Sequence, residues 1–396
     1  MQNGKRERVG VVFGGRSAEH EVSIITGHQV MDALRVAGYS VLPIYITKEG
    51  EWLAGSGLHN IKQYSSRTLF LEKIPGVQRV SLSPDRSVRE LLTTKSGGWT
   101  LFGKQQPMWA DVFFPTVHGT MGEDGTLQGL FELADVPYVG SGVLSSAVGM
   151  DKVRAKSLFR DAGLKVLDCL TVSRAEWQSD PEQFASLAEK SFGYPLIVKP
   201  VCLGSSIGVA RCKDLAELQE AIEVALTLDD NALVEKALTD FIEINCSVLG
   251  PPERASVCEQ PTSSEAVLSF DAKYKRGAKS KNSGTKGGMA SLERIIPAPI
   301  SDDLTARIQE MSIKAFHAIR ATGVARVDFL VDNAHGELFV NEINTMPGSI
   351  AFYLWEASGV PFDELVHNMV VTALEQYRIR AKTRFSFDAN LLMNQP

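Results

Sequence analysis

The chain has 396 residues, of which 44% are hydrophobic and 22% are charged, and its formal net charge is −6. This length allows two or three domains with a large core, and the composition is typical of a globular protein. The negative charge argues against general nucleic-acid binding. The five cysteines are scattered and form no CxxC or Cys/His cluster, so we expect neither a zinc site nor a disulfide framework.

The N-terminus has a basic start but only a short apolar run, which is not typical of a signal peptide. No apolar run reaches transmembrane length, so we expect no membrane partner. A reducing, cytoplasmic setting is the resulting expectation.

The first element is predicted from Val9–Phe13, a short apolar run that is typical of a buried strand and ends in Gly14-Gly15. A helical pattern follows. A strand, a glycine-rich turn and a helix open an α/β domain, in which ligands gather at the carboxyl ends of the strands. Glu21 lies near the start of this helix, where the helix dipole keeps it ionised. It could hold a substrate ammonium or simply favour the helix start, and the pattern supports both alternatives equally.

Two more strands are predicted from Val41–Ile46 and Val112–Val117. The second leads into His118–Thr126, a glycine-dense loop with one histidine and two acids. Such a loop favours a functional role over a purely structural one, because binding residues are concentrated on loops that a rigid scaffold positions.

A phosphate site is predicted from two adjacent segments. Pro195–Lys199 is typical of a strand, and its lysine lies within an apolar run, where it must find an anion or lose its charge. Leu203–Gly208 follows, with small residues whose backbone N–H groups and hydroxyls can cradle phosphate. The alternative is an ordinary hairpin turn. Together, the lysine and the loop favour binding of nucleotide phosphates.

The segment Lys275–Gly288 is basic, contains four glycines and has no apolar residue larger than alanine, so it cannot pack into a core. Most such loops are solvated and incidental. Beside a phosphate site, however, a mobile lid over the nucleotide is a plausible alternative. Residues 303–321 then show helical spacing of apolar residues, and a further helix is predicted near Phe362–Tyr377.

A β-hairpin is predicted from two apolar, β-branched runs, Val324–Val331 and Glu337–Ile343, which flank a polar patch with a glycine. Polar side chains interrupt both runs where buried strands should have none. Pro347-Gly348 then ends the second strand and lets backbone approach a ligand.

The polar interruptions of this hairpin are Asp328, Glu342 and Asn344. The last two are two residues apart and therefore share one face of a strand, and closure of the hairpin brings Asp328 close to them. Oxygen ligands of this kind select a hard divalent cation, and Mg²⁺ suits a site with room for water and phosphate. The alternative is three solvated residues on an exposed strand face. The apolar flanking residues favour the metal site.

Taken in order, these motifs resemble the D-alanine–D-alanine ligases of the ATP-grasp superfamily, from about Val9 to about Ala373. Each motif alone is weak, but all of them in this order are highly specific. The motifs are GGRSAEHEVS at 14–23, HG and GEDGT within 118–126, MDK at 150–152, VKP and GSSIG within 198–208, AKY at 272–274, RVD at 326–328 and NEINT at 341–345.

The resemblance implies an α/β, ATP-grasp fold in three parts. An N-terminal parallel-sheet α/β domain is expected at 1–149 and a central subdomain at 150–237. A C-terminal subdomain with the metal site is expected at 238–396, and the two subdomains would clasp ATP.

The resemblance also implies an activity, the ATP-dependent ligation of two D-alanines through an acylphosphate for peptidoglycan precursor synthesis. Small-molecule substrates are therefore expected, and we expect the chain to form a homodimer. The residues implied for ATP are Lys152, Lys199, Ser205, Ser206 and Lys273 at the phosphates, Glu235, Lys236 and Leu238 at the adenine, and Glu243 at the ribose.

For the metal and the substrates, the resemblance implies further roles. Two Mg²⁺ ions, with Mn²⁺ as an alternative, would be carried by the three hairpin residues named above. Glu21 would bind the ammonium of the first D-alanine, with Ser205 and Tyr274 in the hydrogen-bonded set around it. Arg326 and the backbone of Gly348 would stabilise the phosphate and the tetrahedral intermediate.

Two features depart from the family pattern. After the Pro-Gly pair, family members generally have a longer Ser-containing stretch that helps to bind the second substrate's carboxylate, whereas here only Ser349–Tyr353 intervenes. The loop after Tyr274 is also longer and more basic than usual. The alternative is therefore an ATP-grasp ligase with the same donor half-reaction and a different acceptor, either another amino acid or a D-hydroxy acid. A nucleotide-binding regulatory protein is disfavoured, because it would not need an intact metal-binding set.

Overall fold

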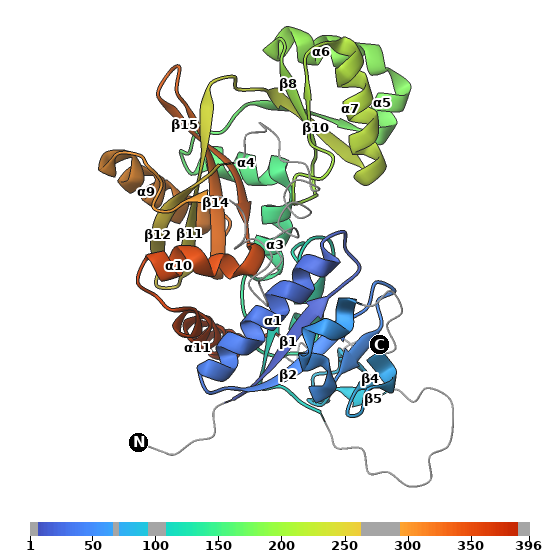
Figure 1. Cartoon of the computed structure of the whole chain (residues 1–396). Helices are drawn as coiled ribbons and strands as arrows, with labels where there is room; N and C mark the ends of the chain where they lie inside the picture. The colour runs from blue at the N-terminus through green and yellow to red at the C-terminus, as the bar shows by residue number, and fades with distance from the viewer. Residues whose placement is uncertain (1–6, 66–70, 94–107, 263–293, 387–396) are drawn as a thin grey trace, which may run out of the picture.

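The computed structural model describes residues 7–65, 71–93, 108–262 and 294–386, which build three sheets (Figure 1). The N-terminal sheet has the strand order β5-β4-β3-β2-β1-β6. Its centre is parallel, because β1 pairs in parallel with both β2 and β6, while β3 to β5 extend it with antiparallel pairing. The sheet is thus mixed rather than fully parallel. The strands are β1 (Arg8–Gly14), β2 (Ser40–Ile46), β3 (Trp52–Ala54), β4 (Gln78–Ser81), β5 (Leu92–Thr93) and β6 (Val112–Pro115).

The first helix of this part, α1 (His20–Val36), packs against β1 through apolar residues that include Val30 and Leu34. It follows the glycine pair directly, so the residues between β1 and α1 lie at the carboxyl edge of the parallel strands. The other helical elements are η1 (Ser56–His59), η2 (Ile61–Ser65), η3 (Leu71–Lys73), α2 (Thr126–Leu133) and α3 (Val143–Met150).

The central sheet is four-stranded and antiparallel, with the order β7-β10-β8-β9. It has a core of its own, in which Trp177, Leu218 and Val234 are buried. Figure 1 shows it in green and yellow-green, away from the blue N-terminal part. Its elements are β7 (Cys169–Ser173), α5 (Arg174–Ser179), α6 (Pro181–Phe192), β8 (Leu196–Pro200), β9 (Ala210–Cys212), α7 (Leu215–Leu228) and β10 (Asn231–Lys236). Helix α4 (Lys152–Asp161) precedes them, but its Ala155 and Phe159 are buried in the core of the third sheet.

The third sheet has the order β13-β12-β11-β14-β15 and is also antiparallel. Helix α9 covers it and buries Ile308, Ala315 and Phe316 in a common core. Its elements are β11 (Phe241–Gly250), β12 (Arg254–Pro261), β13 (Arg294–Ile295), α9 (Asp302–Ala318), β14 (Gly323–Asp332), β15 (Glu337–Asn344), η6 (Gly348–Ala351), α10 (Phe352–Ala357) and α11 (Phe362–Arg380).

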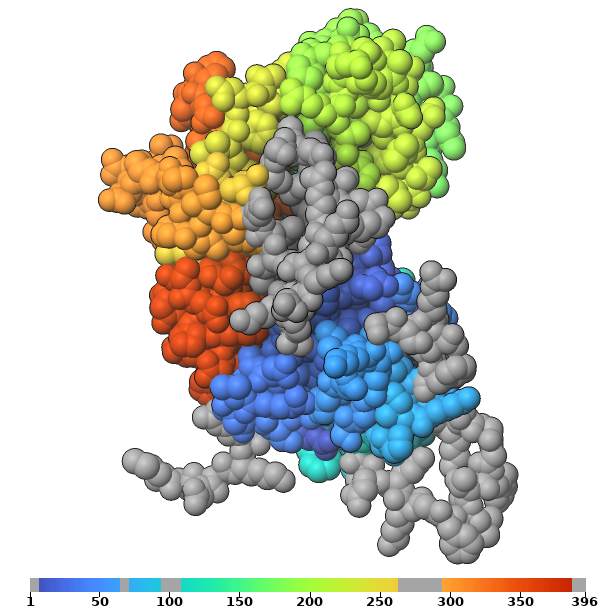
Figure 2. Space-filling view, viewed as in Figure 1, coloured from blue at the N-terminus to red at the C-terminus, as the bar shows by residue number. Residues whose placement is uncertain are grey.

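The last helix leaves the third sheet and joins the first. Helix α11 contacts α1 and β6, and its Leu365 and Met369 are buried in the same core as Val9 and Phe13 of β1. In Figure 2 the red C-terminal residues lie directly against the blue N-terminal ones. The three sheets fall within the three predicted ranges, whose limits stay a prediction, but the C-terminal helix packs with the N-terminal core.

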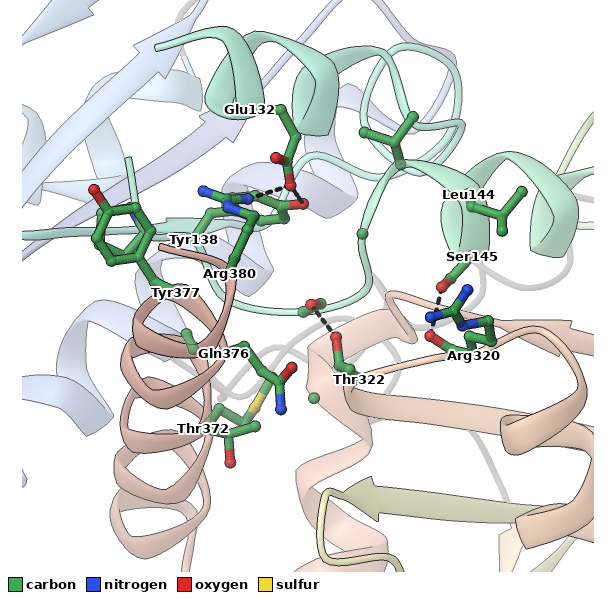
Figure 3. Close-up of a pocket in the computed structure, with 17 residues that line it drawn as sticks. Glu132, Tyr138, Leu144, Ser145, Arg320, Thr322, Thr372, Gln376, Tyr377 and Arg380 are labelled. Carbon is green, nitrogen blue, oxygen red and sulfur yellow. Dashed lines mark hydrogen bonds and ion pairs between the residues drawn. The ribbon is translucent and has the colours of Figure 1, made fainter. Parts of the chain in front are cut away.

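A cavity of about 290 Å³ lies at this junction, between α11, the start of α3 and the turn before β14 (Figure 3). Two hydrogen bonds cross it, from Thr322 Oγ1 to the Gly140 carbonyl and from Ser145 Oγ to the Arg320 carbonyl, both 2.7 Å. None of the described residues that line it belongs to the predicted ATP or metal set. This cavity therefore joins two parts of the fold and is separate from the predicted site.

Most predicted elements are confirmed, including the first two strands, the Val324–Ile343 hairpin and the helices near 303–321 and 362–377. Among the helices of the described residues, we find none that is both long enough and apolar enough to cross a membrane.

Candidate active site

A small crevice of about 20 Å³ lies where the start of α4, the turn after β8 and the end of β15 meet. Its lining includes Lys152 from α4 and Gly204 from the turn. Glu342 and Asn344 contribute from β15, and Glu123 from the glycine-dense loop before α2. Segments far apart in the sequence thus bring a predicted phosphate lysine, two predicted metal ligands and the small-residue turn to one place.

The residues predicted to bind the metal lie on the β14–β15 hairpin. Asp328 is the cross-strand partner of Glu342, and Arg326 is the partner of Asn344. Asp328 is 3% exposed, and the Arg326 guanidinium donates two hydrogen bonds to it, from Nε to Oδ1 and from Nη2 to Oδ2, both 2.6 Å. Asn344 Nδ2 donates a third, of 3.2 Å, to Asp328 Oδ2. The three predicted ligands therefore lie together, and their binding of a metal stays a prediction.

These residues fit a divalent cation by their chemistry. Two carboxylates, Asp328 and Glu342, face each other across the hairpin, and the Arg326 guanidinium binds Asp328. Paired carboxylate oxygens beside an amide are the ligands that a hard cation such as Mg²⁺ prefers. Burial by itself lowers the pKa of Arg326, but the charge of Asp328 outweighs burial and raises the pKa, so the guanidinium stays charged.

The lysine at the start of α4 is fixed by its neighbours. Asp151 is the N-cap of α4 and accepts hydrogen bonds from Val153 N (3.0 Å) and Arg154 N (2.9 Å), which sets where the helix begins. Lys152 is 8% exposed, and its Nζ donates to the Leu203 carbonyl at 2.6 Å. Burial lowers the pKa of Lys152, while the nearby Glu342 opposes that shift. The Lys152 ammonium therefore lies at the edge of the small-residue turn after β8, where phosphate binding is predicted.

Lys199 of β8 is also buried, and it is shared between two sheets. Its Nζ donates to Glu235 Oε1 of β10 at 2.6 Å and to Asn341 Oδ1 of β15 at 3.0 Å. Burial by itself lowers the pKa of Lys199, but the Glu235 carboxylate outweighs burial and raises it, so the lysine is charged. The lysine that the sequence places in an apolar strand therefore has an anionic partner.

The residues predicted to contact the adenine and the ribose differ in their side-chain partners and in their burial. The Glu235 carboxylate is engaged by lysines, and Lys236 Nζ donates to the carbonyls of Gly193 and Tyr194, both at 3.1 Å. The Lys236 side chain thus binds the turn before β8. The adenine contact that the resemblance implies for Lys236 stays a prediction. Leu238 and Glu243 are both partly buried around the start of β11.

The two glutamates near the start of α1 lie in different surroundings. The Glu19 carboxylate is 7% exposed and accepts a hydrogen bond from Ser205 Oγ of the small-residue turn. Glu21 has a side chain that is 66% exposed and pairs with Lys48 at 2.6 Å. The sequence predicts that Glu21 lies near Ser205. In the structure the two residues are apart, because Glu21 pairs with Lys48. Glu19 occupies that place, because residues two apart at a helix start point in nearly opposite directions.

Left-handed backbone conformations mark two segments of the site. Ser205 and Ser206 have φ angles of 54° and 56°, and Ser349, Ile350 and Ala351, which follow Gly348, have φ angles between 48° and 55°. Non-glycine residues rarely adopt this region, and such strain is concentrated at ligand-binding sites. The strained backbone at 205–206 and 349–351 is therefore consistent with the ligand contacts predicted for both segments.

A buried histidine of the glycine-dense loop, His118, is linked through Thr26 to the second of these segments. His118 Nδ1 lies 3.2 Å from Glu123 Oε1, and its Nε2 lies 2.9 Å from Thr26 Oγ1, which also accepts a hydrogen bond from Ser349 N. Burial by itself lowers the pKa of His118, but Glu123 outweighs burial and raises it. The sequence marks this loop as functional without assigning these residues. Its glycine density next to an acid and a histidine is the signal that points to them.

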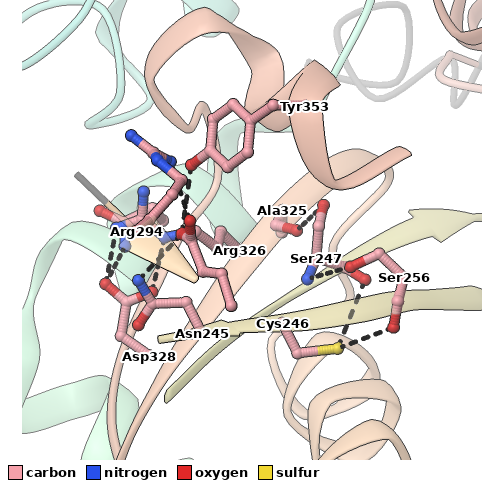
Figure 4. A network of polar contacts seen from close by, with 11 residues as sticks. Asn245, Cys246, Ser247, Ser256, Arg294, Ala325, Arg326, Asp328 and Tyr353 are labelled. Atoms are coloured by element: carbon pink, nitrogen blue, oxygen red, sulfur yellow. Dashed lines mark hydrogen bonds and ion pairs between the residues drawn. The ribbon is translucent and has the colours of Figure 1, made fainter. Parts of the chain in front are cut away.

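A second polar network lies beside the metal residues (Figure 4). The buried Glu259 carboxylate accepts hydrogen bonds from Arg294 Nη1 (2.8 Å), Asn245 Nδ2 (3.1 Å) and Tyr353 Oη (3.2 Å). The Arg294 guanidinium also lies 3.9 Å above the Tyr353 ring. Asn245 is the cross-strand partner of Asp328, so the network adjoins the predicted metal site. The segment that departs from the family pattern therefore ends at this network.

Three predictions lie outside the described residues. They concern Lys273 at the phosphates, Tyr274 near the substrates and the basic segment Lys275–Gly288 as a lid.

Comparisons with known proteins cover nearly the whole chain. The family model described as D-ala D-ala ligase N-terminus matches residues 8–141, and the one described as D-ala D-ala ligase C-terminus matches 158–371. A D-alanine–D-alanine ligase of Heliobacterium modesticaldum is 41% identical over 379 residues, covering 94% of this chain and 96% of that protein. One from Geobacillus thermodenitrificans is 36% identical over 388 residues and covers 97% of this chain and all of that protein (100%).

Solved structures agree. The D-alanine–D-alanine ligase of Coxiella burnetii has a TM-score of 0.78 at 29% identity, covering 96% of this chain and 97% of that one. The VanG D-Ala:D-Ser ligase of Enterococcus faecalis has a TM-score of 0.76 at 30% identity, covering 93% and 99%. The expected ATP-grasp fold is thereby confirmed. By family models and by relatives of nearly equal length, the chain belongs to the D-alanine–D-alanine ligase family.

Proposed function

We propose that this chain uses ATP to join two D-alanine molecules into D-alanyl-D-alanine, for peptidoglycan precursor synthesis. The observation that carries the proposal is the crevice that Lys152, Gly204, Glu342 and Asn344 line together. It combines a phosphate-binding cation, a small-residue turn and oxygen ligands for a metal. Phosphoryl transfer needs this combination of positioning and charge neutralisation.

In the first half-reaction, the γ-phosphate of ATP moves to the carboxylate of the first D-alanine, giving an acylphosphate and ADP. Lys152 and Lys199 hold phosphate oxygens, and the turn at Ser205 and Ser206 offers backbone N–H groups and hydroxyls. Asp328, Glu342 and Asn344 would hold Mg²⁺, which would neutralise part of the charge on the phosphates. Two ions, and their replacement by Mn²⁺, stay predictions.

The first D-alanine requires an anion for its ammonium. Glu19 is buried, lies at the carboxyl edge of β1 and is hydrogen-bonded to Ser205, so it is proposed for this role in place of Glu21. His118 and Glu123 lie on the same side of the N-terminal part and connect this edge to the segment after Gly348. Tyr274, if near the substrates as the family implies, joins this set.

In the second half-reaction, the amine of the second D-alanine attacks the acylphosphate carbonyl, and phosphate leaves with the electrons of the carbon–oxygen bond. Arg326 and the backbone of Gly348 are proposed to stabilise the negative charge that develops on the carbonyl oxygen. The neighbouring Arg294–Glu259–Tyr353 network is proposed to form the wall on the acceptor side.

One assay tests this function. Phosphate release from ATP is measured with D-alanine and with a panel of L-amino acids, other D-amino acids and D-hydroxy acids, and the products are identified by mass spectrometry. We expect D-alanyl-D-alanine as the main product, formed only with Mg²⁺ present. A chain that hydrolyses ATP with no dipeptide, or that prefers another acceptor, contradicts the proposal. The homodimer and the cytoplasmic setting stay predictions.

A further inference from the structure

A buried lysine that the proposed reaction does not use lies one helical turn after Lys152. Lys156 of α4 is 1% exposed, and its Nζ donates to the Leu167 carbonyl at 3.0 Å and to Glu235 Oε2. Lys199 binds the other oxygen of the same carboxylate, Oε1, at 2.6 Å. One carboxylate therefore serves two lysines, one from α4 and one from β8.

This arrangement differs from an ordinary buried ion pair in its charge. Lys156, Glu235 and Lys199 together carry a formal charge of +1, and the Lys156 and Glu235 side chains are each only 2% exposed. An excess charge away from water is costly unless an ion compensates it. Burial by itself raises the pKa of Glu235, but Lys199 and Lys156 outweigh burial and lower the pKa to about 2, so the carboxylate is ionised.

The excess charge is directed toward the nucleotide site. Lys199 is the more accessible lysine, with 12% of its side chain exposed against 2% for Lys156. It also reaches Asn341 of β15, beside the metal ligands, and the charges of Glu342 and Glu243 act on it. Lys156 binds the other carboxylate oxygen and the Leu167 carbonyl, and it is not among the described residues that line the crevice.

We propose that Lys156 is a positioning residue for ATP: by sharing the Glu235 carboxylate, it keeps Lys199 from being fully neutralised and leaves the charge of Lys199 available to phosphate. The proposal rests on the proposed function. Without the charge of Lys156, Glu235 and Lys199 form a closed, neutral pair. A phosphate must then compete with the full carboxylate charge for Lys199.

Five variants of the full-length protein separate this role from a structural one: Lys156→Met, Lys156→Arg, Glu235→Gln, the double variant Lys156→Met with Glu235→Gln, and the control Lys165→Met. Lys165 lies in the exposed pair with Glu337, so its loss changes net charge equally at the surface. Binding of ADP with Mg²⁺ is measured by calorimetry, unfolding is measured by circular dichroism, and KM values are determined for ATP and D-alanine.

We expect Lys156→Met to raise the Kd for ADP about 10-fold or more, equivalent to about 1.4 kcal/mol. Lys156→Arg keeps the charge and should lie within about 3-fold of the unmodified protein. Glu235 is also implied at the adenine, so the double variant is compared with Glu235→Gln alone: without the carboxylate, Lys156→Met should change the Kd for ADP by less than about 3-fold. The KM for D-alanine and the Lys165→Met control should not change.

A folded Lys156→Met protein with unchanged ADP affinity overturns the proposal. The proposal is also overturned if Lys156→Met weakens ADP binding as much in the Glu235→Gln background as in the unmodified protein, because a packing role does not depend on the carboxylate. If Lys156→Met does not fold, the double variant decides, by comparison with Glu235→Gln. Absence of ADP binding by the unmodified protein would refute the proposed function instead.

Discussion

Two ionic clusters flank the crevice, and different side chains predominate in them. In the positive cluster, behind the small-residue turn after β8, Glu235 is bound by the two lysines Lys156 and Lys199. In the negative cluster, on the β14–β15 hairpin, the carboxylates of Asp328 and Glu342 face each other, and Arg326 binds Asp328. The first cluster offers positive charge to phosphate, and the second offers oxygen ligands to a divalent cation, as the proposed function requires.

The largest effect is expected on the negative cluster. Asp328→Asn removes one carboxylate and leaves Arg326 without its partner, so kcat should fall on the order of 10³-fold or more. Asp332→Asn, at the far end of the same strand where Asp332 pairs with His335, serves as the matched control. Phosphate release at saturating Mg²⁺ and circular dichroism are measured for both. Near-normal turnover by a folded Asp328→Asn protein would remove this residue from the metal site.

A second comparison separates the two glutamates near α1. Glu19→Gln removes the charge beside Ser205, and the loss of an ionic hydrogen bond to the ammonium should lower kcat/KM for D-alanine by about 10- to 100-fold. Glu21→Gln removes an exposed pair with Lys48 and should change little, since such pairs contribute weakly. Steady-state kinetics in D-alanine test both. A larger loss in Glu21→Gln than in Glu19→Gln would restore the assignment expected from sequence.

A smaller effect is expected at the edge of the negative cluster. Tyr353→Phe removes the hydroxyl that donates to Glu259 but keeps the ring under Arg294. Because a single hydrogen bond to a charged group is lost, the KM for the second D-alanine should rise by about 3- to 10-fold, with the first site unchanged. Kinetics that resolve the two D-alanine sites provide the measurement. Equal changes at both sites would show that the network supports the whole fold and not the acceptor wall.

The positive cluster also predicts a pH effect that needs no turnover. The pKa of Glu235 falls from 4.5 to about 2 on folding, so its stabilisation is complete above pH 4.5 and is lost as pH falls toward 2. Between pH 4.5 and 2, titration of Glu235 should change the free energy of unfolding by about 1.4 kcal/mol per pH unit. Urea unfolding from pH 7 to 3 should show a shallower acid slope for Glu235→Gln. Identical slopes would mean that Glu235 titrates normally.

The sequence predicts those features that depend on local pattern. The hairpin follows from alternating apolar runs, and its closure alone places Asp328 opposite Glu342. The inward direction of Glu19 instead depends on where α1 begins, which shifts by one or two residues without changing the pattern. The sequence gives no sign that Lys156 is buried in an ion pair, because its partner Glu235 is 79 residues away. Strands β3 to β5 have only two to four residues each, which is too short for a periodic signal to identify them.

The packing of α11 on α1 and β6 has a consequence for the order in which the chain can fold. The apolar face of the first sheet to be synthesised, which includes Val9 and Phe13, is covered by Leu365 and Met369 from the last helix. During synthesis the N-terminal core therefore stays incomplete until nearly the whole chain has left the ribosome. The central sheet, whose core is built from residues 172–234, has no such delay and can form early. An N-terminal fragment that ends before α11 should expose this face and aggregate, although it contains every strand of its sheet.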